Sequence, residues 1–211
     1  MYEVEIKVPA DVDAVRRRLR ASGGERVDAR RQRDVYYDAP HREFAETDEA
    51  LRLRNETALR SGLDSDVVGG STTKLTYKGP LLDAASKTRS EHETMVDDRD
   101  AAEGILSGLG FDPAATVRKR REFWALDGYT VTLDVVDGVG EFVEIEREVA
   151  AEDAIDATRE EAVTVLDRLG LDADAQVRTS YLGLLLAARE TEGTEDGRDD
   201  LTGETDVDGD Y

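Results

Sequence analysis

The chain has 211 residues, a formal net charge of −21 and no cysteine. Such acidity argues against binding to the outside of nucleic acid or to an anionic membrane, and the lack of cysteine excludes a disulfide framework and thiolate chemistry. No apolar run is long enough to span a bilayer, and Met1 leads directly into a predicted strand, so we expect a soluble cytoplasmic protein. Only five lysines accompany 23 arginines, a composition typical of a salt-loaded, halophilic host.

The first half of the chain is predicted to alternate strands with short helices. In chain order, the expected elements are a strand over 3–8, a helix over 12–22, a strand over 25–38, a helical turn near 44–49 and a strand over 50–54. Alternation of charged and apolar residues indicates the strands, and apolar residues at helical spacing before Gly23-Gly24 indicate the helix. A stretch over 60–72, rich in Gly, Ser and Asp, is predicted to be a mobile hairpin loop.

The second half continues this pattern and ends in a tail. The expected elements are strands over 74–80 and 89–93, a helix over 97–109, strands over about 114–126 and 129–137, a strand after the Asp137-Gly138 turn, and helices over roughly 153–169 and 178–189. Residues 190–211 hold ten acidic residues and one arginine, with almost nothing apolar. We therefore expect one domain over 1–188 and an acidic, disordered tail over 189–211.

Charged side chains share one face of most predicted strands, and apolar side chains share the other. In the first strand, Glu3, Glu5 and Lys7 alternate with Val4 and Ile6. The acids on these charged faces are Glu3, Glu5, Glu91, Glu93, Asp134, Glu144 and Glu146. The bases are Lys7, Arg52, Arg54, Lys74, Lys78, Arg89, Lys119 and Arg121.

Two arrangements of these faces are open. In the first, the charged faces form the solvated outside of a sandwich. In the second, the sheet curls into a barrel whose charged face lines the interior and whose apolar outer face lies under amphipathic helices, each of which needs such a surface. We favour the barrel. Clustered carboxylates repel each other without a hard divalent cation, and clustered guanidinium groups suit phosphate oxygens, so the interior is predicted to hold a metal-chelated oligophosphate.

Taken in order, the charged motifs resemble the CYTH superfamily, which comprises class IV adenylate cyclases, thiamine triphosphatases and related triphosphate tunnel metalloenzymes. The motifs are Glu3-x-Glu5-x-Lys7, Arg52-x-Arg54, Lys74-x-Thr76-Tyr77-Lys78-Gly79-Pro80, Arg89-x-Glu91-x-Glu93, Lys119-x-Arg121, Asp134 and Glu144-x-Glu146. The resemblance runs from Met1 to about Leu186. The stretches 44–52 and 116–121 look most like the archaeal class IV cyclase branch.

The resemblance implies an α+β fold with a closed, antiparallel eight-stranded β-barrel (the triphosphate tunnel) and amphipathic helices packed outside it. It implies a reaction on a nucleoside or other triphosphate that requires Mg²⁺ or Mn²⁺. The implied metal ligands are Glu3, Glu5, Asp134, Glu144 and Glu146, with Glu91 and Glu93 as supporting tunnel acids. The implied phosphate ligands are Arg52, Arg54, Lys74, Lys78 and Arg89, and the implied catalytic residues are Lys7, Lys119 and Arg121. A homodimer is left open, and no nucleic acid or membrane partner is expected.

Three functions remain open. The branch-level match favours a class IV adenylate cyclase, which converts ATP to cyclic AMP and pyrophosphate. The second function is a triphosphatase acting on inorganic or thiamine triphosphate. It suits Glu144-x-Glu146 equally, and no His-Phe pair of the bacterial cyclases precedes Glu3. The third is a binding module without turnover, against which the intact carboxylate set argues. No base pocket can be identified, and Trp124 is expected to pack near a strand end rather than to stack on a base.

Overall fold

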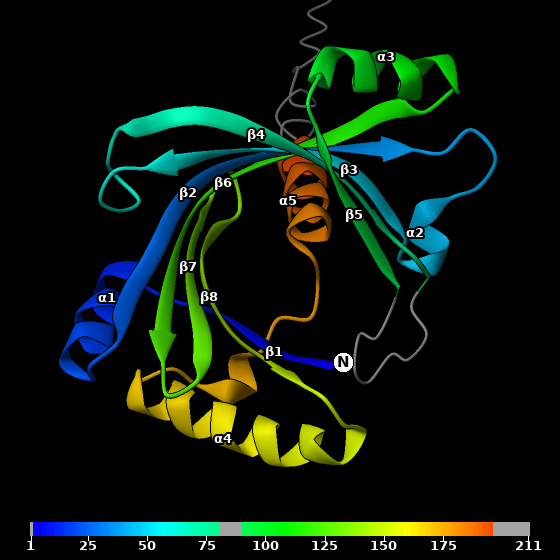
Figure 1. The fold of residues 1–211 in the computed structure, drawn as a ribbon. Coiled ribbons are helices and arrows are strands. Elements are labelled where there is room, and N and C mark those ends of the chain that lie inside the picture. The colour runs from blue at the N-terminus through cyan, green and yellow to red at the C-terminus, as the bar shows by residue number, and fades with distance from the viewer. Residues whose placement is uncertain (1, 81–89, 196–211) are drawn as a thin grey trace, which may run out of the picture.

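A computed structural model describes residues 2–80 and 90–195 of the chain (Figure 1). Its strands are β1 (Tyr2–Pro9), β2 (Glu25–Asp38), β3 (Ala50–Leu59), β4 (Val67–Lys78), β5 (Glu91–Val96), β6 (Asp112–Leu126), β7 (Tyr129–Val136) and β8 (Gly140–Val149). Its α-helices are α1 (Val12–Ala21), α2 (Phe44–Thr47), α3 (Arg99–Gly108), α4 (Ile155–Arg168) and α5 (Tyr181–Glu195). Short 3₁₀ turns lie at Glu152–Ala154 and Ala173–Ala175.

All eight strands belong to one antiparallel sheet in the order β1-β8-β7-β6-β2-β3-β4-β5. The sheet curves strongly, so that one face is concave (Figure 1). β1 and β5 form its two edges, and no hydrogen-bonded ladder joins them within residues 2–80 and 90–195. The predicted α+β fold with an eight-stranded antiparallel sheet is confirmed, whereas closure of the barrel by hydrogen bonds is not.

Helices cover the convex face of the sheet, because that face carries the apolar residues of each strand. α1 and α4 pack over β1, β7 and β8 through a cluster that includes Leu19, Val131, Ile145 and Leu166. α2 and α3 contribute Phe44 and Leu106 to a second cluster, which contains Val35, Leu51 and Leu53 of β2 and β3. Burial of these apolar stripes stabilises the fold and leaves the charged residues on the concave face.

The position of α5 differs from the prediction that the helices pack outside. α5 lies on the concave side, in the middle of the curved sheet (Figure 1). Its residues Tyr181 and Leu185 form a third cluster with Val117, Val136 and Phe142. These three residues share the strand face that carries Lys119, Asp134 and Glu144, so one end of the concave face is apolar and requires a cover.

Two predicted boundaries also change. β4 begins at Val67, so Gly69-Gly70 belongs to a strand and only residues 60–66 connect β3 to β4. α5 continues to Glu195, beyond the predicted end at residue 189. Residues 196–211, which hold most of the predicted tail, lie outside the described residues. In the described part of the chain, no helix has the length and apolar content needed to cross a bilayer.

Candidate active site

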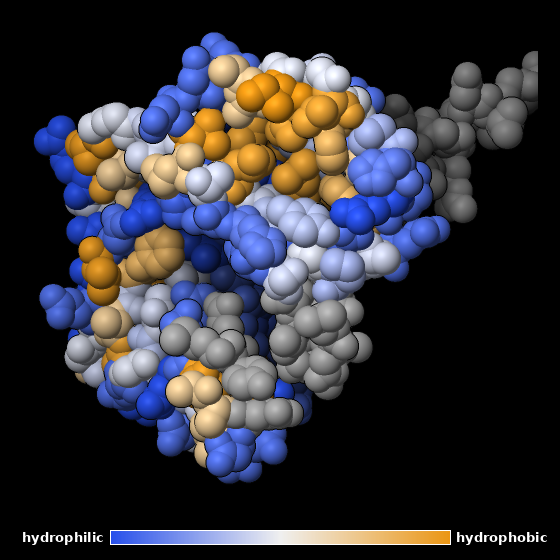
Figure 2. All heavy atoms as spheres, turned by 45° about the vertical axis from the view of Figure 1, so that its right-hand side comes forward, coloured by the Kyte–Doolittle hydropathy of each residue, from blue (hydrophilic) through white to orange (hydrophobic). Residues whose placement is uncertain are grey.

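Of the charged residues predicted from strand alternation, those whose side chains the structure describes line the concave face; Glu3 and Arg89 are outside that set. Strand register places them in rows across the sheet: Lys7 pairs with Glu144, Glu144 with Thr132, and Thr132 with Phe123. On the other half of the sheet, Arg54 lies opposite both Asp34 and Lys74. Figure 2 shows a hollow lined by hydrophilic atoms on this side of the molecule. The concave face is therefore the candidate active site.

Three carboxylates, Glu5, Glu144 and Glu146, form a group on the adjacent strands β1 and β8. Each offers one oxygen, and these oxygens all lie within 4.8 Å of one another. Carboxylate oxygens are the ligands that Mg²⁺ and Mn²⁺ prefer, so this carboxylate trio fits a hard divalent cation. It contains three of the five predicted metal ligands. A fourth, Glu3, lies on β1, but its side chain is outside the described residues.

Asp134, the fifth predicted metal ligand, has basic partners and lies outside the trio. Its side chain is fully buried and pairs with Arg121, while Lys119 Nζ lies 3.4 Å from Asp134 Oδ2. Burial opposes the charge of Asp134, but Arg121 and Lys119 outweigh it and hold the pKa of the carboxyl well below its usual range. Arg121 also pairs with Glu144, which belongs to the trio. One guanidinium group thus joins Asp134 to the trio.

Arg52 and Arg54, two predicted phosphate ligands, are held by Asp34 of β2. Arg54 donates from Nε to Asp34 Oδ1 at 2.7 Å and from Nη2 to Oδ2 at 2.6 Å, and Arg52 Nη1 lies 3.5 Å from Oδ2. Asp34 is only 2% exposed. Burial alone would raise the pKa of Asp34, but hydrogen bonds and charge from Arg54 lower it. The sequence prediction missed Asp34. Its alternation with Gln32 and Tyr36 indicates that the three residues share one face of the strand.

A second missed acid, Glu56 of β3, lies beside the same arginines. Its carboxylate accepts hydrogen bonds from Arg30 Nη1 at 2.9 Å and from Gln32 Nε2 at 2.6 Å. Lys74 Nζ is 3.9 Å away, and the Glu56 residue is 5% exposed. Asp34 and Glu56 together orient the basic groups on β2, β3 and β4 before any ligand arrives.

The lysines of β4 pair with the acids of β5, which the prediction assigned as supporting acids. Lys74 lies 2.9 Å from Glu93, and Lys78 lies 2.9 Å from Glu91. Burial opposes the charge of Glu93, but hydrogen bonds from Lys74 and Thr76 lower the pKa of its carboxyl. Arg89, the remaining predicted phosphate ligand, lies outside the described residues.

Lys7 and Lys119, predicted as catalytic residues, meet at the segment that leads into α5. Both ammonium groups lie over the Tyr181 ring, at 4.5 and 4.8 Å from its centroid. Lys7 Nζ also donates to the carbonyl oxygen of Thr179 at 2.6 Å. Burial and the nearby charge of Arg121 lower the pKa of Lys119 to about 8. The hydroxyl of Tyr181, a residue that the sequence analysis did not assign to the site, donates to Asp134 Oδ2 at 2.8 Å.

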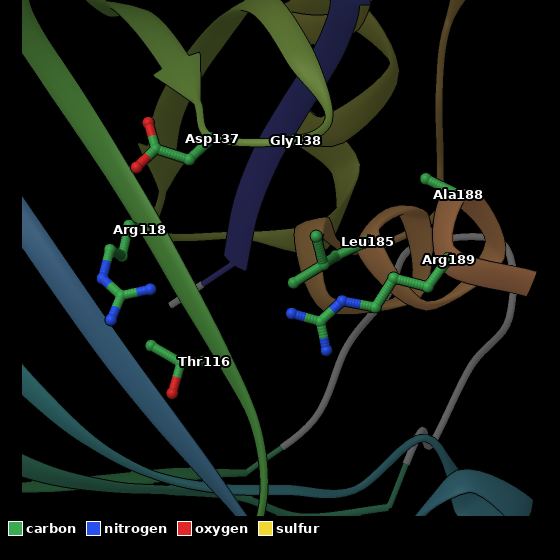
Figure 3. A pocket seen from close by; sticks show the side chains of 7 residues that line it. All are labelled: Thr116, Arg118, Asp137, Gly138, Leu185, Ala188 and Arg189. Atoms are coloured by element: carbon green, nitrogen blue, oxygen red, sulfur yellow. The ribbon is translucent and has the colours of Figure 1, made fainter. Parts of the chain in front are cut away.

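A separate cavity of about 260 Å³ lies where α5 meets β6, outside this charged cluster (Figure 3). It is lined by Thr116, Arg118, Asp137, Gly138, Leu185, Ala188 and Arg189. Arg118 is exposed whereas its neighbour Lys119 is buried, as the alternation of their strand predicts. Trp124 is 3% exposed in the cluster beneath α1 and α4, so the expectation that it packs rather than stacks on a base is confirmed.

Comparison with known proteins places this geometry in a family. The family model for the CYTH domain matches residues 1–181. The chain is 35% identical over 185 residues to "Putative adenylate cyclase MJ0240" of Methanocaldococcus jannaschii, covering 87% of this chain and 98% of that protein. It is 28% identical over 180 residues to "Adenylate cyclase CyaB" of Aeromonas hydrophila, covering 84% and 85%. The solved structure of the PH1819 protein from Pyrococcus horikoshii OT3 superposes with a TM-score of 0.75 at 38% identity, covering 88% of this chain and 99% of the other.

Proposed function

We propose, from the premise that the chain belongs to the CYTH domain family, that it is a metal-dependent enzyme that converts ATP to cyclic AMP and pyrophosphate. The observation that carries this proposal is the position of the carboxylate trio beside a continuous set of basic side chains. A triphosphate needs a cation between its oxygens and the carboxylates, and guanidinium or ammonium groups along the rest of its length. The named relatives support a nucleotide as the substrate.

The roles of the residues follow from their present partners. Glu5, Glu144 and Glu146 would hold the metal. When bound, Mg²⁺ or Mn²⁺ supplies charge neutralisation at the α-phosphate and makes the ribose 3′-hydroxyl easier to deprotonate. Lys7, Lys119 and Arg121 neutralise charge near the reacting phosphorus. The basic side chains Arg52, Arg54, Lys74 and Lys78, each within 4.0 Å of a carboxylate, would hold the β- and γ-phosphates as the leaving group.

Binding of the triphosphate requires an exchange of ion-pair partners. Arg54 now bonds Asp34, and Lys74 bonds Glu93, so phosphate oxygens must share or replace these carboxylates. Arg121 would turn from Glu144 toward the substrate as Glu144 takes part in metal binding. The 3′-hydroxyl oxygen then attacks the α-phosphorus, the bond to the β-phosphate oxygen breaks, and the hydroxyl proton is released. The closed tunnel predicted from the sequence remains part of this proposal. The hydrogen-bonded strand order itself leaves β1 and β5 as two edges.

A triphosphatase is the second candidate, and the trio is the observation that favours it. Glu144 and Glu146 both belong to the trio, as a site that orients water toward a γ-phosphorus would require. The same basic side chains would serve that reaction without change. The two candidates differ in the attacking oxygen, and hence in the product.

The test is a product assay with the purified full chain, ATP and Mn²⁺ at high salt, with nucleotides and phosphates separated by chromatography. We expect cyclic AMP and pyrophosphate in equal amounts. Orthophosphate without cyclic AMP would replace the cyclase with the triphosphatase, and tight binding without any product would leave a binding module. The Glu144→Gln variant, purified in parallel, controls for contaminating enzymes, since it should lose whichever activity belongs to the site.

A further inference from the structure

Phe123 is an aromatic residue that lies outside the three apolar clusters of the protein. Every other aromatic residue whose side chain the structure describes belongs to one of the three apolar clusters: Phe44, Phe111, Phe142, Trp124, Tyr36, Tyr37, Tyr77, Tyr129 and Tyr181. Phe123 belongs to none of them and is half-buried. Its neighbour Trp124 faces the convex side beneath α1 and α4. An aromatic ring outside every apolar cluster needs an explanation.

Phe123 lies on the concave face, in the same row as the carboxylate trio. It alternates with Lys119 and Arg121 along β6, and it pairs with Thr132, which in turn pairs with Glu144. Because neighbouring strands are about 4.8 Å apart, the backbone of Phe123 is roughly 10 Å from that of Glu144. One strand, β7 with Thr132, therefore separates Phe123 on β6 from the proposed metal ligand Glu144 on β8.

Two guanidinium groups, each paired with carboxylates, lie over the ring. The guanidinium carbon of Arg30 lies 5.5 Å from the ring centroid, and that of Arg121 lies 5.7 Å from it. An aromatic face combined with flanking cations is the arrangement by which proteins hold a nucleotide, since the base stacks on the ring and the cations neutralise phosphate. An inorganic triphosphate would use only the cations.

Space beyond the trio lies at the same end of the sheet as Phe123. A cavity of about 420 Å³ is lined by Gly128, Thr130, Glu146, Arg147 and Glu148. Thr130 pairs with Ala125, two residues after Phe123, and Glu146 belongs to the trio. Ligand pockets run from about 300 to 1,000 Å³, so this volume is in that range, and Phe123 itself is not among the residues that line the cavity. The opposite end of the concave face is covered by α5.

We propose that Phe123 stacks on the planar base of a nucleoside triphosphate, whose phosphates extend from Arg121 toward Arg54. This inference rests on the proposed function, because it presumes that a triphosphate occupies the concave face. It adds a residue that determines specificity: the Phe123 ring would favour a nucleotide over an inorganic triphosphate. Stacking on a ring is available to every base, so Phe123 alone selects little among adenine, guanine and the pyrimidines.

The test compares binding of two ligands that cannot react, in the presence of Mg²⁺. One is α,β-methylene-ATP, and the other is bis(phosphonomethyl)phosphinate, a triphosphate analogue without a base. Calorimetry on the full chain and on Phe123→Leu should show affinity for the ATP analogue about 5- to 150-fold weaker in the variant, the range for one lost stacking contact. Affinity for the base-free analogue should stay within about twofold. Phe123→Trp should restore binding of the ATP analogue.

A matched control and the decisive outcomes complete the design. Phe111→Leu removes a ring from the cluster beneath α3 and should leave both affinities unchanged. If Phe123→Leu lowers the affinity for both ligands equally, the ring only positions Arg30 and Arg121, and the proposal is wrong. If neither affinity changes, the base binds elsewhere, which also overturns it. Selective loss of the ATP analogue in a protein that makes no cyclic AMP would keep this inference while rejecting the cyclase.

Discussion

Asp34 on β2 accepts two hydrogen bonds from the guanidinium group of Arg54 on β3, at 2.7 Å from Nε and 2.6 Å from Nη2. The two residues are directly opposed in the strand register, and Asp34 is almost completely buried. A fork held in this way keeps its orientation without a ligand, so little side-chain freedom is lost when phosphate binds. The pair therefore connects the stability of the sheet with the geometry of the proposed phosphate site.

Asp34→Asn is expected to lower the free energy of unfolding by about 3 kcal/mol at neutral pH, because it leaves Arg54 buried without its counter-charge. The pKa of Asp34 is lower in the folded protein than its ordinary value of 3.8. Its stabilising charge is thus fully present above pH of about 4 and is lost as pH falls through the folded pKa. Since Asn does not titrate, the difference from the wild type should shrink as urea denaturation is repeated at lower pH.

The control for Asp34 is Asp38→Asn, at the exposed end of the same strand. It should change the free energy of unfolding by no more than about 0.5 kcal/mol. A loss at Asp34 that stayed constant down to the acid transition would show that the carboxylate charge is not what stabilises Arg54.

Glu5→Gln should reduce catalytic activity by orders of magnitude, because it keeps the shape of the side chain and removes one negative charge from the carboxylate trio. If metal occupancy is the defect, raising the Mn²⁺ concentration should restore part of the activity. A metal titration of initial rates measures this. Glu160→Gln on the exposed face of α4 is the matched control and should follow the wild-type curve. An activity loss that no Mn²⁺ concentration reduces would remove Glu5 from the metal site.

Arg54→Lys should lower kcat/KM by about 10- to 100-fold, because lysine keeps the charge and loses the planar fork that matches two oxygens. Additional metal should not recover this loss, in contrast to Glu5→Gln. Arg118→Lys is the control: Arg118 is exposed and lines the cavity beside α5. If Arg118→Lys or Arg118→Ala damaged catalysis as much as Arg54→Lys in a folded protein, the assignment of strand faces would be wrong.

The position of α5 on the concave side can be tested with two adjacent leucines. Leu185 is 6% exposed and packs on the sheet, whereas Leu186 is 43% exposed. Leu185→Ala should lower the free energy of unfolding by about 2 to 4 kcal/mol, and Leu186→Ala by less than about 1 kcal/mol. Thermal or urea denaturation separates the two. Equal effects would mean that Leu185 is not the residue through which α5 packs on the sheet.

Strand alternation was the most reliable signal in the sequence. A period of two separates the faces of a strand without knowledge of its neighbours, so the charged side chains of β1, β3, β4 and β6 could be assigned together. Asp34 and Glu56 were missed for a related reason. Their meaning depends on which strand lies beside them, and the pairing of β2 with both β3 and β6 is a long-range property of the sheet.

The sequence predicted that the helices form, but it did not predict on which side of the sheet α5 lies. Residues Leu182 to Leu186 are apolar on more than one side, so periodicity does not distinguish a helix outside the sheet from one inside it. Gly69 and Gly70 predict a loop because glycine favours turns, but they lie inside β4, at the register shift between the Thr57–Ser71 and Ala58–Val68 pairs, where a β-bulge accommodates them.

The contact of Lys7 with Thr179 joins residues 172 positions apart, and in the described part of the chain β8 is the strand that pairs with β1. β1 must therefore wait for β8, which lies much later in the sequence, before this ladder can form. Contacts of such long sequence separation slow folding, because loop closure must be achieved before they stabilise anything. We expect β1 and the segment leading into α5 to dock last and together. In refolding experiments, the metal-binding carboxylates of β1 and β8 should then assemble in the slowest phase.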